Sequence, residues 1–172
     1  STGTRISHNP SAIFSIRGRN PTTELIDAGA VVMLGSDGSA PDRSYDMFRH
    51  MFQATRYHRF YFRDPNVLPA GKVLEMATID AARALGMEKE IGSLEVGKRA
   101  DLITVSLDSP HAYPMFNVYS QLVNALKGSD VSDVVVNGKL LVEQRKPLTL
   151  DPVKVRAAAE RYTGAVQKSL GR

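Results

Sequence analysis

The feature that most constrains the fold is a short apolar run, AVVML at residues 30–34, which leads directly into Gly35. A continuous apolar run of this length is typical of a strand covered on both faces, as in parallel sheets packed between helices. Gly35 and Gly38 lie on either side of Asp37, so the backbone can turn sharply where the strand ends. The run therefore predicts an α/β fold with Asp37 at the carboxyl end of a buried strand.

Asp37 is the first candidate for chemistry. The carboxyl ends of parallel strands are where active-site residues collect in α/β folds. A carboxylate there is placed to bind a cation or to take a proton. The alternative is that Asp37 caps a turn or the N-terminus of a helix, where Asp is common. The neighbouring residues alone leave both alternatives open.

A second strand is predicted at residues 4–8, and Asn9–Pro10 turns the chain out of it because proline cannot continue strand pairing. Asn20–Pro21 predicts the start of a helix, with Asn as its cap and Pro at its first position, and Gly29 ends that helix. The order strand, loop, helix, strand over residues 4–38 predicts a parallel βαβ unit.

His8 ends the first of these strands, so we expect it at the same edge of the sheet as Asp37. A histidine there either orients a substrate or binds a metal, or it is a hydrogen-bonded structural residue. Arg17 and Arg19 follow in a loop on this rim, where they either meet an anionic group or face water. We take His8, Arg17 and Arg19 as the candidate substrate-binding residues.

Apolar residues at helical spacing predict a helix over residues 45–58, and Pro69 opens a second predicted helix that Gly86 ends. In Arg56–Arg63, arginines alternate with aromatic residues, as they do on surfaces that bind single-stranded nucleic acid. We expect instead a helix end with rings packed inward and arginines outward, and no nucleic-acid partner.

The character of the chain changes at Lys89. A strand is predicted within residues 100–107, and a β-branched run at 131–136 followed by Asn137–Gly138 predicts an antiparallel hairpin. Asp151–Pro152 predicts the start of a terminal helix. Its expected packing face comprises Val155, Ala158, Ala159, Tyr162 and Val166. The predicted division of the chain is residues 1–88, 89–150 and 151–172.

The composition limits the chemistry and the location of the protein. The chain has no cysteine, so a metal would have to be held by His, Asp or Glu. No apolar run approaches the roughly 20 residues of a membrane helix, and the polar start is not a signal peptide. We therefore expect a cytoplasmic protein with no membrane partner.

Four segments occur in an order that points to a known family: His8–Asn9–Pro10, Leu34–Gly38 with Asp46–Met47, Met76–Gly86, and Ile91–Leu102. Together they resemble the carboxyl-terminal part of the amidohydrolase superfamily, in the branch of the triazine hydrolases, guanine deaminase, and the adenosine and S-adenosylhomocysteine deaminases. The resemblance implies that residues 1–88 form the last two strands and helices of a metal-dependent (β/α)₈ TIM barrel. It further implies that residues 89–150 form part of a small β-sandwich domain.

By this resemblance Asp37 closes the eighth barrel strand, where it binds one divalent metal and shuttles the proton of an activated water. Zinc is the first expectation for that metal and iron the second. The implied reaction is hydrolysis of a carbon–nitrogen bond in a small heterocyclic substrate, by a deaminase or a related amidohydrolase. The implied partners are the amino-terminal half of the same polypeptide and further copies in a homo-oligomer.

The family's remaining metal ligands have no counterpart here, because no two of His8, His50, His58 and His111 are spaced as His-x-His. A mononuclear site needs about three further protein ligands, so we expect this chain alone to be an incomplete enzyme. The alternative is a non-catalytic relative, an assembly or binding protein that keeps the barrel without the metal. A His-x-His pair upstream would favour the enzyme.

Overall fold

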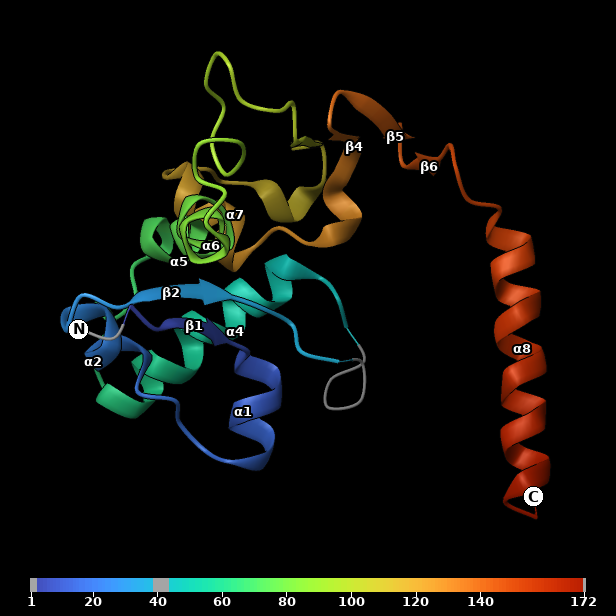
Figure 1. Ribbon diagram of the computed structural model, residues 1–172, viewed down its shortest axis with the longest axis horizontal. Coiled ribbons are helices and arrows are strands. Elements are labelled where there is room, and N and C mark those ends of the chain that lie inside the picture. The colour runs from blue at the N-terminus through green and yellow to red at the C-terminus, as the bar shows by residue number, and fades with distance from the viewer. Residues whose placement is uncertain (1–2, 39–43, 172) are drawn as a thin grey trace.

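The computed structural model describes residues 3–38 and 44–171 (Figure 1). Its first sheet is a parallel pair, β1 (Arg5–His8) and β2 (Val31–Leu34), in a register that places Arg5 beside Val31 and His8 beside Leu34. The predicted parallel unit is thus confirmed. In β2, Val32 and Leu34 are buried whereas the alternate residues are only partly buried.

Two helices connect the parallel strands: α1 (Pro10–Ile16) and α2 (Thr22–Asp27). The sequence predicts only a loop where α1 lies. Proline is tolerated in the first turn of a helix, so Pro10 ends the strand and begins α1 at once. Helix α2 starts one residue later than predicted, at Thr22, whose amide donates to the Asn20 carbonyl oxygen at 2.8 Å.

Among the described residues, three helices follow: α4 (Met47–Phe62), α5 (Ala70–Ala77) and α6 (Ile79–Leu85). The sequence predicts α5 and α6 as one helix, but the chain breaks at Thr78, with φ −128° and ψ −97°. The Thr78 hydroxyl donates to the Leu74 carbonyl at 2.7 Å, and such side-chain bonds compete with the helical ladder. Gly86 ends α6 in the left-handed conformation, as predicted.

The second sheet is antiparallel and has the order β3 (Leu102–Val105), β4 (Val131–Val136), β5 (Lys139–Glu143) and β6 (Lys146–Pro147). Asn137 and Gly138, at φ 50° and 74°, form the turn between β4 and β5. Positive φ at both central residues defines the type I′ hairpin that Asn-Gly favours. The predicted antiparallel module and its hairpin are therefore confirmed.

The segment between β3 and β4 leaves the sheet and packs on the helices. It contains two short 3₁₀ turns, η1 (Pro110–Ala112) and η2 (Gly128–Asp130), and the unpredicted helix α7 (Val118–Asn124), which contacts α4 and α5. One hydrophobic core joins β2, α4, α5 and this segment. Its buried members are Val32, Leu34, Phe48, Met51, Ala54, Leu68, Val73, Met76, Ala112, Val123 and Leu126.

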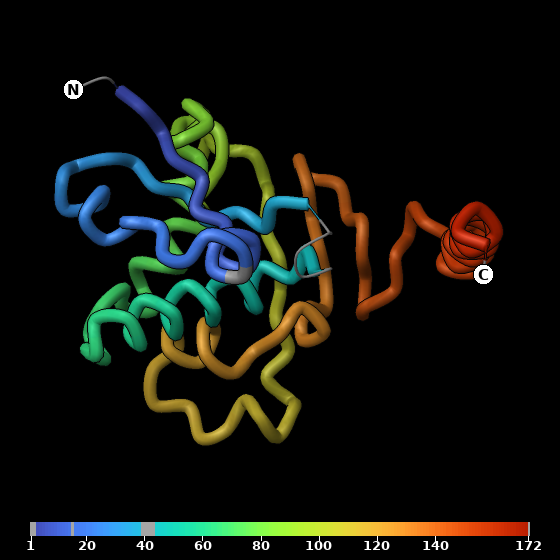
Figure 2. Tube along the Cα trace, turned by 90° about the horizontal axis from the view of Figure 1, so that it is seen from below, coloured from blue at the N-terminus to red at the C-terminus, as the bar shows by residue number. Residues whose placement is uncertain are grey.

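The terminal helix α8 (Pro152–Ser169) is capped by Asp151, as predicted, and it stands clear of the rest of the chain in both views (Figures 1 and 2). Its expected packing face is exposed in this structure, since Val155, Tyr162 and Val166 each leave more than half of their surface uncovered. Among the described residues, no helix has the length and apolarity needed to cross a membrane.

Candidate active site at the ends of the parallel strands

The carboxyl ends of β1 and β2 remain paired beyond the last residue of β2. The Gly35 amide donates to the His8 carbonyl oxygen at 2.9 Å, which extends the ladder by one bond past β2. A Cβ atom on Gly35 would lie 2.3 Å from Asn9 Oδ1 and 2.7 Å from Ser7 Oγ. A larger residue at position 35 would therefore have to displace the side chains of Ser7 and Asn9, which lie against the start of the segment after β2.

Asp37 lies two residues beyond this contact, and its side chain is exposed. Its backbone is left-handed, with φ 62°, and its Oδ1 accepts a hydrogen bond from the Gly38 amide at 2.5 Å. Asp and Asn are among the few residues that adopt this conformation readily. The carboxylate is thus an anionic group at the carboxyl edge of the parallel pair.

His8 lies beside this edge but its ring is fully buried. The ring packs edge-on against Phe14 in α1 and His58 in α4, with centroid distances of 6.2 Å and 5.2 Å. Neither ring nitrogen has a hydrogen-bond partner among the described residues. Burial, reinforced by the nearby His58, lowers the pKa of His8 to about 3, so the ring is neutral at pH 7. Its role in substrate binding stays a prediction.

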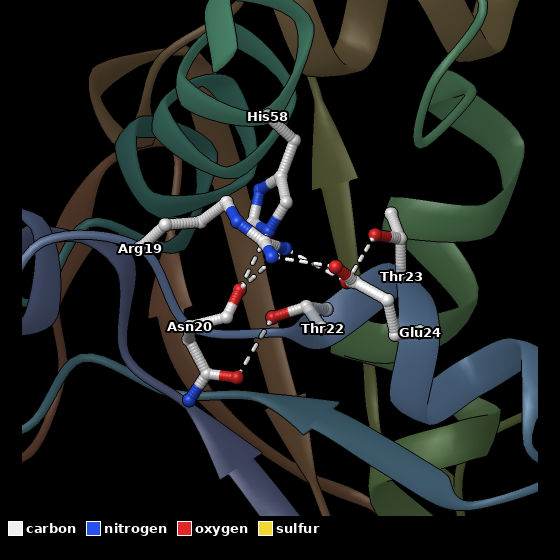
Figure 3. Close-up of polar contacts among 6 residues, drawn as sticks. All are labelled: Arg19, Asn20, Thr22, Thr23, Glu24 and His58. Atoms are coloured by element: carbon white, nitrogen blue, oxygen red, sulfur yellow. Dashed lines mark hydrogen bonds and ion pairs between the residues drawn. The ribbon is translucent and has the colours of Figure 1, made fainter. Parts of the chain in front are cut away.

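Arg19 lies in the loop between α1 and α2, where its guanidinium forms a double ion pair with Glu24 at 2.7 Å and 2.5 Å (Figure 3). The same group lies over the Tyr61 ring at 4.4 Å. The Arg19 bonds, followed by one from Thr23, lower the pKa of Glu24 to about 2. These contacts tie α2 to the end of α4. Arg17, by contrast, is exposed, and substrate contacts of either arginine stay predictions.

The Arg56–Arg63 segment is not arranged as the sequence suggests. Phe60 is 86% exposed and Tyr61 58% exposed, so these rings do not pack inward. Arg59 points back into the chain instead, donating to the carbonyl oxygens of Val67 and Leu68 at 3.2 Å and 3.4 Å. The expectation is therefore wrong for Phe60, Tyr61 and Arg59, whereas Arg56 and Arg63 are exposed as expected.

The described residues do not bring together a set of ligands that could hold a metal by themselves. No group of three or more His, Asp or Glu side chains in this part of the chain is placed to hold an ion. Asp37 suits a divalent cation because it offers carboxylate oxygens that are exposed at a strand end. The other strand-end candidate, His8, is turned into the protein.

A polar cluster that the sequence does not reveal surrounds Asp130, which is 3% exposed. Its carboxylate binds His111 Nε2 at 2.8 Å, Ser109 Oγ at 3.3 Å and the Lys127 amide at 2.9 Å. Ser, His and Asp here do not form a catalytic relay, because the hydroxyl and the imidazole both contact the same carboxylate rather than each other. The cluster clamps η1 to η2.

We expect Asp130→Ala to lower the free energy of unfolding by about 1–3 kcal/mol, since it removes the buried carboxylate that accepts three hydrogen bonds. Urea unfolding of the two proteins measures this difference. Asp133→Ala is the control, because that carboxylate lies among exposed groups on β4. Equal losses of unfolding free energy in Asp130→Ala and Asp133→Ala would contradict a special role of the buried Asp130 carboxylate.

A parallel strand pair with a carboxylate at its carboxyl edge, followed by a small antiparallel sheet, defines an α/β protein whose candidate site lies at the strand ends. The sequence matches the Amidohydrolase family over residues 2–141. The chain belongs to this family, which confirms the resemblance drawn from its motifs.

Relatives of similar sequence are deaminases. The chain is 41% identical over 153 residues to a 5-methylthioadenosine/S-adenosylhomocysteine deaminase of Moorella thermoacetica, covering 88% of this chain and 36% of that protein. It is also 41% identical over 160 residues to a 5'-deoxyadenosine deaminase of Methanosarcina acetivorans, covering 90% of this chain and 37% of the relative. The chain thus spans little more than a third of the length of these relatives.

Solved structures give the same result for the fold. A zinc-bound adenosine deaminase from Xanthomonas campestris superposes with a TM-score of 0.91 at 32% identity, over 94% of this chain and 37% of that one. An atrazine chlorohydrolase from Arthrobacter aurescens, in complex with zinc, superposes with a TM-score of 0.80 at 30% identity, over 92% and 36%. Both matches support an amidohydrolase fold.

Proposed function

We propose that this chain forms the carboxyl-terminal part of a metal-dependent hydrolase that removes an amino group from a nitrogen heterocycle of the adenosine type. The observation that carries the proposal is Asp37, exposed at the end of β2 in a chain 41% identical to adenosine-type deaminases. In this proposal residues 1–88 are the last part of a (β/α)₈ barrel, and residues 89–150 are part of a β-sandwich domain.

The proposed metal is zinc, with iron second, because two structural neighbours carry zinc. A bound divalent ion supplies Lewis acidity, which makes water a nucleophile near neutral pH. In this chain Asp37 would be one ligand. Its Oδ1 is already tied to the Gly38 amide, which leaves the second oxygen to contact the ion. The other ligands would come from the amino-terminal half of the polypeptide.

The proposed chemical role of Asp37 is to take the proton of the attacking water and to return it to the leaving amine. A carboxylate suits this role when it is charged at neutral pH and sits on a rigid element. The bond to Gly38 and the ladder bond from Gly35 to His8 both fix the backbone around Asp37. We further propose a homo-oligomer, as expected from the resemblance.

The function is tested by ammonia release from 5'-methylthioadenosine, S-adenosylhomocysteine and 5'-deoxyadenosine with the complete protein. We expect turnover of at least one of these nucleosides, loss of turnover after chelation, and recovery on adding zinc. Metal analysis should find about one ion per chain, as a mononuclear site requires. A complete protein that binds no metal and releases no ammonia would instead support the non-catalytic alternative.

A further inference from the structure

The face of the parallel pair that is turned away from the helices carries two polar side chains outside the proposed chemistry. Successive residues of a strand point to opposite faces of the sheet. His8 packs against α1 and α4, so its neighbours Ser7 and Asn9 lie on the other face, where Ser7 is exposed and Asn9 is partly buried. A Cβ atom on Gly35 would lie 2.7 Å from Ser7 Oγ and closer still to Asn9 Oδ1, which places both polar groups over this glycine.

The side chain of Asn9 has an unusual role for its position in the chain. Asn9 is the N-cap of α1, where asparagine commonly accepts from a backbone amide, but its side chain makes no capping hydrogen bond. Its Oδ1 accepts instead from the Ser7 hydroxyl at 3.2 Å. Within residues 3–38 and 44–171, the Asn9 amide nitrogen donates no hydrogen bond. Ser7 thus holds the amide while its two N–H donors stay free.

These free donors lie close to the residue that the proposed function makes the metal ligand. Asn9 lies against Gly35, and Asp37 follows Gly35 by two residues, a span of at most about 7 Å along the chain. Every residue of this connection is described. A purine whose amino-bearing carbon lies at Asp37 therefore has neighbouring ring atoms within reach of Asn9.

The chemistry of the free group selects the substrate atom that it suits. An amide nitrogen only donates, so its partner on the substrate must be an acceptor. On the edge of adenine that carries the amino group, N7 is an acceptor, whereas the amino group is a donor. In the proposed reaction Asp37 acts at the carbon that carries this amino group. Asn9, next to Asp37, therefore faces the edge that presents N7.

We propose that Asn9 binds the substrate by donating a hydrogen bond to N7 of the purine, and that Ser7 is a positioning residue that orients the Asn9 amide. The inference rests on the proposed function, because it takes an adenine-type base as the substrate and Asp37 as the group at its reacting carbon. The contact makes Asn9 a determinant of specificity, since a base with a C–H group in place of N7 leaves the donors without an acceptor.

The test compares a nucleoside with its 7-deaza analogue, in which a C–H group replaces N7, in the complete protein and three variants. Asn9→Leu keeps a side chain of similar shape but has no donor, and Ser7→Ala removes only the group that orients the amide. Asn66→Leu is the matched control, because Asn66 is exposed between α4 and α5. Each protein is assayed with 5'-methylthioadenosine and its analogue, and the ratio of the two kcat/KM values is compared between proteins, which cancels differences in intrinsic reactivity.

We expect Asn9→Leu to lower this ratio roughly two- to tenfold, the range for one neutral hydrogen bond, and Asn66→Leu to leave it unchanged. Ser7→Ala should lower the ratio by a smaller factor. It should have no further effect in the Asn9→Leu background, because Ser7 acts through Asn9. Calorimetric binding of both compounds to the metal-free proteins repeats the comparison without turnover, and the same change in the ratio of affinities is expected.

Unchanged ratios in Asn9→Leu would overturn the inference, as would a loss of the same size in Asn66→Leu. If Asn9→Leu does not fold, as judged by thermal unfolding, an unchanged ratio in Ser7→Ala overturns it. These results leave the proposed function standing as long as the original protein releases ammonia from the nucleoside. A protein that binds the nucleoside without releasing ammonia contradicts the proposed function alone, and the affinity ratios then decide the role of Asn9. A protein that does neither overturns both.

Discussion

Replacing Asp37 with Asn in the complete protein is expected to lower turnover by roughly 10²–10⁴-fold, the range that a positioned acid–base group contributes. The amide keeps an oxygen that accepts the Gly38 bond, and Asn tolerates the left-handed backbone at φ 62°. The variant therefore removes the charge while it preserves the local structure. Ammonia release at saturating substrate measures the effect, and thermal unfolding checks that the fold is retained.

Asp37→Ala is expected to abolish turnover too, but it is a less specific test. Alanine at a left-handed position costs about 1–2 kcal/mol of strain, so part of its effect would come from the backbone. Asp64→Asn is a suitable control, because Asp64 also accepts a nearby backbone amide, that of Asn66 at 2.8 Å, at the end of α4. Near-normal activity in Asp37→Asn would remove Asp37 from the mechanism.

Acid is expected to destabilise the protein through His8. The pKa of His8 is about 3 in the folded chain, against 6.5 for an unperturbed histidine. Below pH 6.5 the unfolded state binds the proton and the folded state does not, so stability falls as the pH drops from 6.5 towards 3. One pKa unit corresponds to about 1.4 kcal/mol, so the loss from pH 7 to pH 4 is about 3 kcal/mol.

His8→Phe tests this assignment. Phenylalanine keeps a ring against Phe14 and His58 but has no group that titrates. Urea unfolding at pH 7 and pH 4 should show a smaller loss of stability for the variant than for the original protein. The pKa of His58 is also lowered, chiefly by burial, so some acid sensitivity should remain. Identical pH dependence in both proteins would show that His8 is not the group responsible.

The sequence predicts the elements whose pattern is local. The run at residues 30–34 and the pair Asn137–Gly138 each specify a backbone conformation through their own side chains, and both are found in the structure. Helix α7 has only seven residues, and short helices depend on packing more than on propensity. Its contacts with α4 and α5 lie far away in the sequence, so no local pattern indicates them.

In the candidate site too, some features follow from local sequence patterns and others depend on contacts between distant residues. The position of Asp37 at a strand end follows from the apolar run and the glycines. The burial of His8 could have been predicted from strand alternation, because Ile6 and His8 are in register with the buried residues Val32 and Leu34. The ion pair of Arg19 with Glu24 depends on tertiary geometry, which sequence spacing does not give.

Asp46 is the N-cap of α4, and its two carboxylate oxygens face different parts of the molecule. Oδ1 accepts from the Phe48 amide at 3.0 Å, and Oδ2 accepts from the Gly128 amide in η2 at 3.0 Å. A Cβ atom on Gly128 would lie only 3.1 Å from this carboxylate, so the contact is close. One side chain thus joins the start of a long helix to the entry of the antiparallel sheet. Movement of Asp46 breaks both hydrogen bonds at once. We therefore expect the start of α4 and the η2 turn to unfold cooperatively rather than one after the other.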